Sequence, residues 1–157
     1  MKSIKVKKIK AFSIIELLVA MTAFLLIAIP IRSLVALGYR NITYDNSYLK
    51  AVFYAKEGIE AARYVRAASW SSFTSGTHGI QLNNNGWQLT ENPITENGYE
   101  RSIIISDVYR DANGNIVDGN SGTLDPDSKK VVSKVNWTWL SVQTKEVSFE
   151  TYLTHEN

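Results

Sequence analysis

The chain has 157 residues, with 17 Lys and Arg, 15 Asp and Glu, two His and no Cys. This length suits one domain with or without an appendage, and the lack of Cys excludes a disulfide scaffold, a thiolate zinc site and a cysteine nucleophile. Residues 1–11 hold five lysines and no acid, whereas residues 12–157 hold 12 basic and 15 acidic side chains. A mildly acidic body behind a basic tag is not expected to bind nucleic acid.

Residues 12–31 form an apolar segment, FSIIELLVAMTAFLLIAIPI, in which Glu16 is the single charge. Twenty helical residues rise about 30 Å, the thickness of the hydrocarbon core of a bilayer. The preceding lysines predict that the N-terminus stays in the cytoplasm and that the rest of the chain lies outside. Three ordinary interpretations compete. A signal peptide usually has a shorter apolar run that ends in an A-x-A-like cut site, and this segment is longer and has no such site. A plain single-pass anchor leaves the costly Glu16 unexplained, and the lysine cluster disfavours a buried core helix.

The junction KKIKAFSIIELLVA, residues 7–20, resembles the prepilin signal of type IV pilins and the related pseudopilins. In that family a basic leader ends in a small residue, and a membrane peptidase cuts before an apolar residue, usually Phe, which becomes N-methylated. The fifth residue after the cut is Glu. The resemblance implies cleavage between Ala11 and Phe12, methylation of Phe12 and a role for Glu16. Ala11 stands where the family mostly has Gly, and we still expect cleavage because Ala is small.

Glu16 is the candidate assembly residue. Cleavage would expose a new ammonium group on Phe12, and an isolated charge in a low-dielectric environment is costly unless an opposite charge compensates it. The resemblance implies that Glu16 pairs with the Phe12 amine, of a neighbouring subunit during assembly. The alternative interpretation is a carboxylate at the membrane surface that caps the N-terminus of the helix.

Residues 32–66 predict an amphipathic continuation of the apolar segment. No Pro follows position 32 in this range, so residues 12–66 would form one helix of about 80 Å, with a kink or short unwound stretch at Pro30. Side-chain ion pairs are expected on one face among Lys56, Glu60 and Arg63. The apolar stripe that would cover a sheet has helical spacing and consists of Ile42, Leu49, Val52, Ala55, Ile59 and Ala62.

Residues 67–157 are expected to form a β-rich globular head. A Ser-, Thr- and Gly-rich linking loop is predicted at 67–79, and the stretch 111–130 is full of turn-forming residues. Asn85-Gly86 would supply the positive-φ turn of a small hairpin, and residues 141–145 would connect the last two strands. Strands are predicted at 80–82, 87–89, 99–110, 116–117, 131–140 and 146–153. The inward-facing side chains of the last two are expected to be Val131, Ser133, Val135, Trp137, Trp139, Val147, Phe149 and Leu153.

The fold class predicted from these elements is α+β, with an antiparallel sheet whose apolar face is covered by the helix. A long N-terminal helix packed on a small antiparallel sheet is also the architecture that the resemblance to pilins implies. The stretch AKEGIEAAR, residues 55–63, followed by Trp70, is similar to minor pilins of the type IV pilus modification kind.

Other candidate sites are weak. Residues 111–122 have some spacing of a calcium loop, but Gly122 stands where an acidic ligand is needed, and an Asx-rich turn between strands explains them as well. His78 and His155 lie far apart in the sequence and are expected at the surface, without a metal cluster. The sequons at Asn41 and Asn136 are attributed to chance.

Aromatic and basic side chains in the head are expected to pack rather than to bind a ligand. Trp and Tyr on sheets are usually half-buried packing residues, and neither a stacking platform nor a basic groove is evident in the sequence. The residues considered are Trp70, Trp87, Trp137 and Trp139, with the lysines Lys129, Lys130 and Lys134.

These patterns predict a structural subunit rather than an enzyme, with no cofactor, metal or small-molecule substrate. Its expected partners are prepilin peptidase, other pilin subunits, and membrane lipid before assembly. The precursor is expected to be a single-pass protein of the cytoplasmic membrane with its head outside, and the processed subunit to lie in a cell-surface or periplasmic filament. Two alternatives stay open: a pseudopilin of a type II secretion or DNA-uptake machine, and an uncut, membrane-anchored binding domain.

Overall fold

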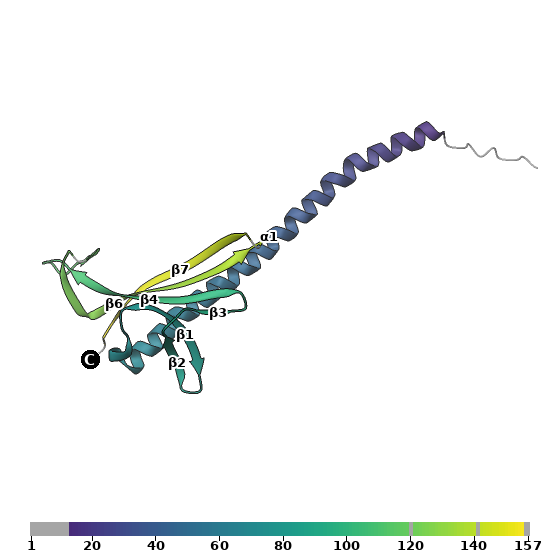
Figure 1. The fold of residues 1–157 in the computed structure, drawn as a ribbon. Coiled ribbons are helices and arrows are strands. Elements are labelled where there is room, and N and C mark those ends of the chain that lie inside the picture. Colours follow the sequence, from purple (N-terminus) through teal and green to yellow (C-terminus); the bar gives the residue numbers. More distant parts are fainter. Residues whose placement is uncertain (1–12, 120, 141, 156–157) are drawn as a thin grey trace, which may run out of the picture. The chain divides into compact units, whose positions relative to one another are not determined.

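The computed structural model describes residues 13–119, 121–140 and 142–155, and its chain is drawn in Figure 1. It divides into two compact units, residues 1–43 and residues 44–157. The helix α1, Ile14–Ala68, contributes to both. The first unit consists, in its described part, of the apolar beginning of this helix, and the second contains the end of the helix together with the sheet.

In the first unit α1 runs without interruption through Pro30, so the predicted unwound stretch is wrong. Proline removes one backbone donor, but its fixed φ is compatible with a helix, and the loss is confined to one bond. Next to the ring, the Ser33 hydroxyl donates to the Ile29 carbonyl at 3.2 Å, which adds a hydrogen bond at this level of the helix.

In the second unit α1 buries a face of small residues against the sheet. The predicted stripe is right at Ala55, Ile59 and Ala62 and wrong at Leu49, which is 52 % exposed. Ile42, placed in the same stripe, lies in the first unit and is exposed. The helix turns its smallest side chains inward because they allow the closest approach to the strands. The buried helix residues are Ala51, Ala55, Gly58, Ile59, Ala61, Ala62 and Val65.

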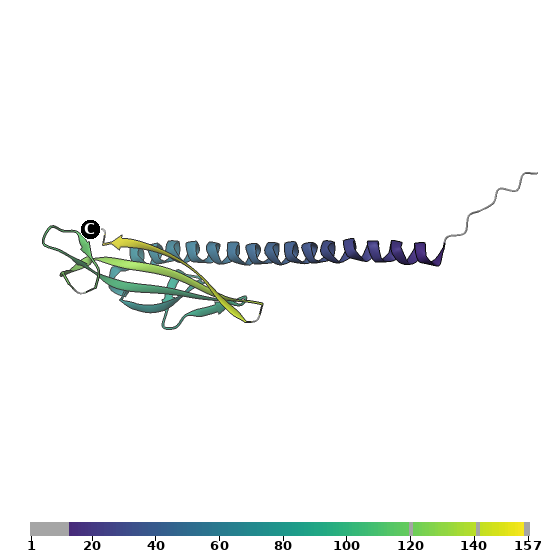
Figure 2. The same cartoon turned by 90° about the horizontal axis from the view of Figure 1, so that it is seen from above.

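All pairings between the described strands are antiparallel, as predicted, and they form a single sheet (Figure 2). The strand order is β2-β1-β4-β6-β7, and the short strands β3 and β5 also pair with β4. A 3-10 turn, Trp70–Ser72, links α1 to the sheet. The strands are β1 (Gly76–Asn83), β2 (Gly86–Thr90), β3 (Ile94–Glu96), β4 (Tyr99–Arg110), β5 (Ile116–Val117), β6 (Thr123–Trp139) and β7 (Gln143–Thr154).

Several predicted boundaries move. The loop predicted at 67–79 is shorter, because α1 continues to Ala68 and β1 begins at Gly76. In the β1–β2 turn only Gly86 has a positive φ, of 104°, and Asn85 does not. A Cβ on Gly86 would lie 2.2 Å from the Tyr64 hydroxyl, so this position needs glycine for close approach as well as for its backbone angle. The predicted connection 141–145 is also shorter, since Trp139 already pairs with Gln143.

The largest error concerns residues 123–130, which were placed in a turn-rich stretch and form the first half of β6. Pro126 discourages a strand because it cannot donate to the ladder. In the structure Asp107 pairs with Lys129 and Val108 with Asp125, so the residues between them bulge out of the β4–β6 ladder. A bulge is a position where a strand tolerates proline.

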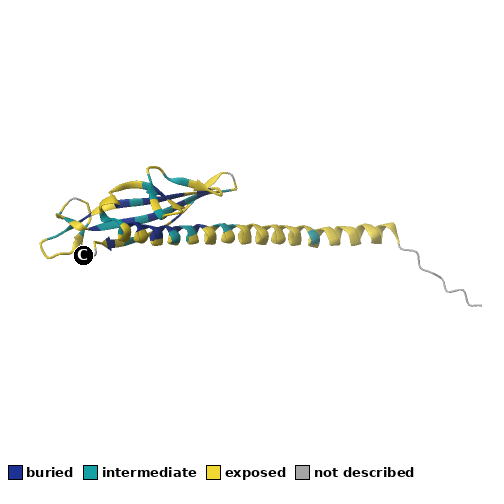
Figure 3. Cartoon of the chain, turned by 90° about the horizontal axis from the view of Figure 1, so that it is seen from below, coloured by how far each residue is buried: buried dark blue, intermediate teal, exposed yellow. Residues whose placement is uncertain are grey.

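The core of the second unit lies between α1 and the sheet, where Figure 3 shows the buried residues on the facing sides of both. The inward positions predicted for β6 are confirmed from Val131 to Trp137, and Trp139 is half-buried. Phe149 was predicted inward with Val147 and Leu153, but it is 36 % exposed. It lies on β7, the edge strand, where neighbouring structure covers it only on one side.

Candidate membrane-spanning and assembly segment

The predicted cleavage site, Ala11 and Phe12, lies outside the described residues. The helix begins next to it: the Glu16 and Leu17 backbone amides both donate to the Ser13 carbonyl at 3.1 Å. Glu16 is in the first turn of α1 and its side chain is exposed. A carboxylate at this position is favoured by the partial positive charge of the helix N-terminus, and Ser13 and Glu16 have the S-x-x-E spacing of a capping box.

The apolar side chains of the first unit face outward all round the helix. From Ile14 to Ile42, every large hydrophobic side chain is between 51 % and 79 % exposed. A helix that is apolar on every face is stable in lipid or among other helices rather than in water. Within the described residues, α1 is one helix that is long and apolar enough to cross a membrane, and its most apolar window is not buried at all.

Two hydroxyl side chains of this segment hydrogen-bond within their own helix. The Thr22 hydroxyl donates to the Val19 carbonyl at 2.9 Å, and Ser33 donates to Ile29 as described above. Such bonds lower the cost of placing a hydroxyl in hydrocarbon, where water is absent. The geometry therefore suits insertion into a bilayer or into a bundle of apolar helices.

The tryptophans of the second unit pack, as predicted. Trp137 is buried, and Trp70, Trp87 and Trp139 are half-buried. Trp139 meets the Tyr44 ring edge-on at 5.3 Å, and Trp70 stacks on His155 at 5.2 Å. His155 is exposed as predicted, whereas His78 is half-buried and its Nε2 lies 3.0 Å from the Thr74 carbonyl oxygen.

The three lysines of β6 are each paired with a neighbouring acid. Lys130 lies 3.0 Å from Glu150, Lys134 lies 2.6 Å from Glu146, and Lys129 is bonded to Asp107. The hydrogen bond from Lys129 lowers the pKa of Asp107 below its ordinary value, and the one to Glu150 raises the pKa of Lys130. Each of these lysines therefore has an acidic partner on a strand next to β6.

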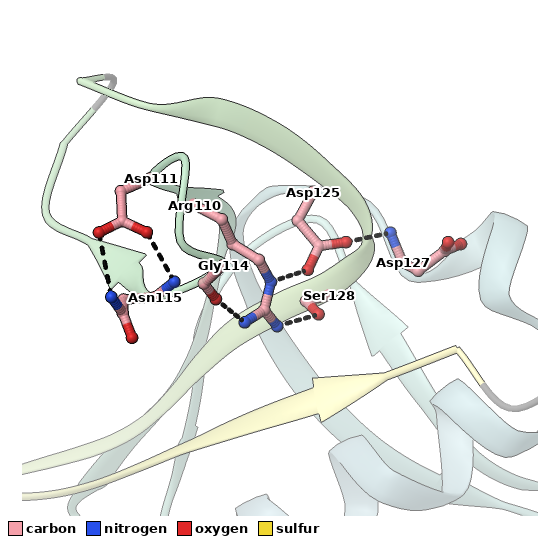
Figure 4. Close-up of polar contacts among 7 residues, drawn as sticks. All are labelled: Arg110, Asp111, Gly114, Asn115, Asp125, Asp127 and Ser128. Atoms are coloured by element: carbon pink, nitrogen blue, oxygen red, sulfur yellow. Dashed lines mark hydrogen bonds and ion pairs between the residues drawn. The ribbon is translucent and has the colours of Figure 1, made fainter.

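Residues 111–115, which belong to the stretch considered as a calcium loop, form an Asx-type turn, the other interpretation given for this stretch. One Asp111 oxygen accepts the Asn113 and Asn115 backbone amides at 2.9 and 2.8 Å, and the other accepts the Asn115 side chain at 3.1 Å. These bonds lower the pKa of Asp111, with the Asn115 side chain first among them. Both oxygens are thus used by the turn itself (Figure 4).

Arg110 holds the base of the same turn (Figure 4). Its guanidinium donates to Asp125 at 2.6 Å, to the Gly114 carbonyl at 2.9 Å and to the Ser128 hydroxyl at 3.3 Å. The Arg110 bond is the main reason why the pKa of Asp125 is lowered. In the part of the chain that the structure describes, no three His, Cys, Asp or Glu side chains are grouped to hold a metal.

Sequence reasoning missed a buried charged centre at Arg101 on β4. Its side chain is 7 % exposed, donates to Glu57 of α1 at 2.6 Å and to Glu96 of β3 at 3.2 Å, and lies 4.7 Å from the Tyr54 ring centre. These contacts tie helix and sheet together within the second unit. The alternation of Tyr99, Arg101 and Ile103 was the available signal, because alternate residues of a strand share a face.

Comparison with known proteins adds no relative: no family model, no curated protein and no solved structure matches the chain.

Proposed function

We propose that this chain is a structural subunit of a type IV pilus-like filament, most similar to the minor pilins. It would be cut between Ala11 and Phe12, stored in the cytoplasmic membrane through residues 12–31, and assembled through the same segment. The observation that carries the proposal is the division of α1, which packs on the sheet in its last third and leaves its large apolar side chains exposed over the first thirty residues.

The sequence features support the same proposal. A basic leader, a small residue, Phe12 and Glu16 at the fifth place stand directly before the exposed apolar helix. Subunit affinity would come from packing of apolar helices, and a Glu16–Phe12 charge pair would favour one register because a charge in such a bundle needs a partner. A pseudopilin of a secretion or DNA-uptake machine would use the same features, and its gene neighbourhood would distinguish it.

A single-pass anchored binding domain is the second candidate, since the exposed apolar helix also suits a permanent anchor. Mass spectrometry of the mature N-terminus separates the two. We expect a chain that begins at Phe12 and is heavier by one methyl group. A chain that begins at Met1, purified from cells with an active prepilin peptidase, would favour the anchor and contradict the proposal.

Two substitutions refine the test. Ala11→Val should block processing because it crowds the cut site, whereas Ala11→Gly should be processed at least as well as the natural chain. Glu16→Ala should be cleaved but enter filaments poorly, because the Phe12 amine loses its partner. Normal filament content of Glu16→Ala would exclude the charge pair, and normal processing of Ala11→Val would show that the site is elsewhere.

A further inference from the structure

The strand β7 forms a long open edge of the sheet in the second unit (Figure 1). Among the described strands it pairs with β6 alone, and the opposite edge strand, β2, has only 5 residues. β7 has 12 residues without proline, and its register with β6 runs from Gln143 to Thr154 without a bulge. Short strands, prolines and bulges are the features that keep sheet edges from pairing with other chains. The edge at β7 has none of these features.

Every second residue of β7 directs its backbone groups to this open edge. The His155 amide donates to the Asp127 carbonyl at 2.8 Å, which continues the β6–β7 register. Because hydrogen-bonded pairs alternate along an antiparallel ladder, the odd-numbered residues of β7 bond to β6 and the even-numbered ones point outward. In agreement, the Thr154 carbonyl accepts from Arg66 of α1 at 2.7 Å. The even-numbered residues within 146–152 are all exposed, so their backbone groups are open to a further strand.

The acidic side chains along β7 already have partners in their own sheet. Glu146 lies 2.6 Å from Lys134, and Glu150 lies 3.0 Å from Lys130, both on β6. Unpaired charges along an edge discourage a second strand. Because both acids have a basic partner, this protection is weak at β7.

Phe149 lies in the middle of the open edge. It has the same parity in β7 as the buried Val147 and Leu153, so it belongs to the apolar face of the sheet. It is nevertheless 36 % exposed, because β7 has no described neighbour on its outer side. A strand added at this edge would cover it.

The sequence of β7 is self-complementary in one antiparallel register. In a continuous sheet each face must continue across the new pair, so odd-numbered residues lie opposite odd-numbered ones. When Phe149 lies opposite its counterpart in a second copy, the two rings form an aromatic cross-strand pair, which stabilises antiparallel strands. The other pairs of this register are Ser148 with Glu150, Val147 with Thr151, and Glu146 with Tyr152.

The neighbouring registers are less favourable. A register centred one residue earlier places Glu146 opposite Glu150, and one centred one residue later places Glu150 opposite itself. Like charges directly opposite each other destabilise a pair of strands. A register centred on Val147 avoids these clashes but loses the pair of Phe149 rings.

We propose that two copies of this chain pair through β7 in an antiparallel, two-fold arrangement centred on Phe149. The even-numbered residues from Glu146 to Tyr152 would exchange backbone hydrogen bonds, and the two sheets would become continuous. The partner is a second copy because β7 matches its own sequence in this register. The inference concerns the second unit alone and does not depend on the proposed function. A two-fold pair is closed, so such a pair would separate before its subunits joined a filament built from a head-to-tail contact.

The test is disulfide trapping in the full chain, which contains no Cys, so a single-Cys variant can form only intermolecular disulfides. In the proposed pair, residue 149 lies opposite its counterpart at a non-hydrogen-bonded position. Their Cα atoms would be about 4.5 Å apart, a distance that a disulfide spans. Phe149→Cys, purified in detergent and oxidised with copper phenanthroline, should therefore form dimers.

The matched control is Thr144→Cys, which is exposed on the same strand. In the proposed pair its counterpart lies roughly 30 Å away along the strands. It should therefore cross-link at least about tenfold more slowly than Phe149→Cys, because a disulfide requires close Cα atoms.

Two further variants test the backbone bonds. Added to Phe149→Cys, Ser148→Pro removes an outward N–H and leaves the bonds to β6 intact, whereas Ser148→Ala keeps this N–H. Proline is tolerated at an edge position whose N–H points to solvent, so the near-ultraviolet circular dichroism spectrum should be unchanged. We expect dimer formation to fall about tenfold with Pro, because each copy loses one backbone donor, and to stay the same with Ala.

Three results would overturn the proposal. Chains that meet only through their apolar segments would cross-link at positions 144 and 149 at similar rates. Faster cross-linking of Ser148→Cys than of Phe149→Cys would place the centre elsewhere, and a lack of dimers in Phe149→Cys would exclude the pair. None of these results bears on cleavage between Ala11 and Phe12, which mass spectrometry tests separately.

Discussion

The two parts of α1 show how one helix can satisfy two different surroundings. Residues 14–43 expose bulky apolar side chains on every face, whereas residues 44–68 bury Ala51, Ala55, Gly58 and Ala62 against a sheet. Large apolar side chains can pack against lipid or against helices of other chains. Small side chains let the helix backbone approach the sheet of its own chain closely. Both parts of α1 are therefore helical, and the size of their side chains decides what each part can pack against.

The largest difference between the two units is expected in the free energy of unfolding that is lost when a large apolar side chain is replaced by Ala. Ile103→Ala, in the core beside α1, should lower the free energy of unfolding of the head by about 3 kcal/mol, because it leaves a cavity. Leu34→Ala, at a side chain 68 % exposed in the first unit, should change it by less than about 0.5 kcal/mol. Urea unfolding of the full chain in detergent, followed by tryptophan fluorescence, measures both, and similar losses would contradict the division of α1.

The Arg101 centre offers the next largest effect. Glu57→Gln combined with Glu96→Gln leaves a buried guanidinium without a charged partner, and the cost should be about 2 kcal/mol, since both acids are half-exposed and are not fully desolvated. Glu60→Gln breaks only the exposed pair with Arg63 and should cost less than about 0.5 kcal/mol. The same unfolding experiment serves, and equal costs for the buried and the exposed pair would show that Arg101 does not tie helix to sheet.

The two glycines of α1 give a smaller but matched comparison. A Cβ on Gly58 would lie 2.2 Å from the Ser133 hydroxyl, whereas nothing lies within 4 Å of one on Gly38. Gly58→Ala should therefore lose about 1 kcal/mol net, because crowding in the buried contact exceeds the gain in helix propensity. Gly38→Ala should leave unfolding of the head unchanged. A stabilising effect of Gly58→Ala would mean that helix and sheet are further apart than described.

The smallest expected effect is a dependence of the stability of the head on pH, which arises from three aspartates of the head. The pKa values of Asp107, Asp111 and Asp125 lie below their ordinary value of 3.8, so the unfolded chain takes up protons first as the pH falls. Their contribution to stability is complete above the ordinary value and is lost as the pH falls through the lowered values.

Urea midpoints measured between pH 6 and pH 2.5 should thus decline at the acid end. Asp125→Asn, which cannot titrate, should flatten part of this decline, because the lowered pKa of Asp125 no longer contributes. An identical acid profile for Asp125→Asn and the natural chain would show that the Arg110 bond does not stabilise the head.

Sequence patterns predicted the elements that obey a simple periodicity. The strand at 99–110 and the alternation from Val131 to Trp137 were predicted correctly, because period-two patterning survives in any half-buried sheet. The strand over 123–130 was missed, since Pro126 and the neighbouring Asp and Ser residues favour turns locally and only a long-range bulge accommodates them. The Asx turn at Asp111 was predictable because its bonds are made within five residues.

The long apolar helix was predicted from the sequence, and the charged centre of the head was not. The apolar run is a continuous stretch of the chain, so its hydropathy is visible without the fold. Arg101, Glu57 and Glu96 come from three different elements, so only folding brings them together. The rotation of α1 that buries Gly58 and exposes Leu49 likewise depended on the shape of the sheet beneath it.

By itself, the sequence determined a basic N-terminal stretch, an apolar helix long enough for a membrane and a β-rich remainder, because charge, hydropathy and period are local properties of the chain. Tertiary structure alone decided which face of α1 is buried, how Pro126 enters a strand and where Arg101 finds its partners. These outcomes depend on close packing between residues far apart in the sequence, where a few tenths of an ångström separate a contact from a clash.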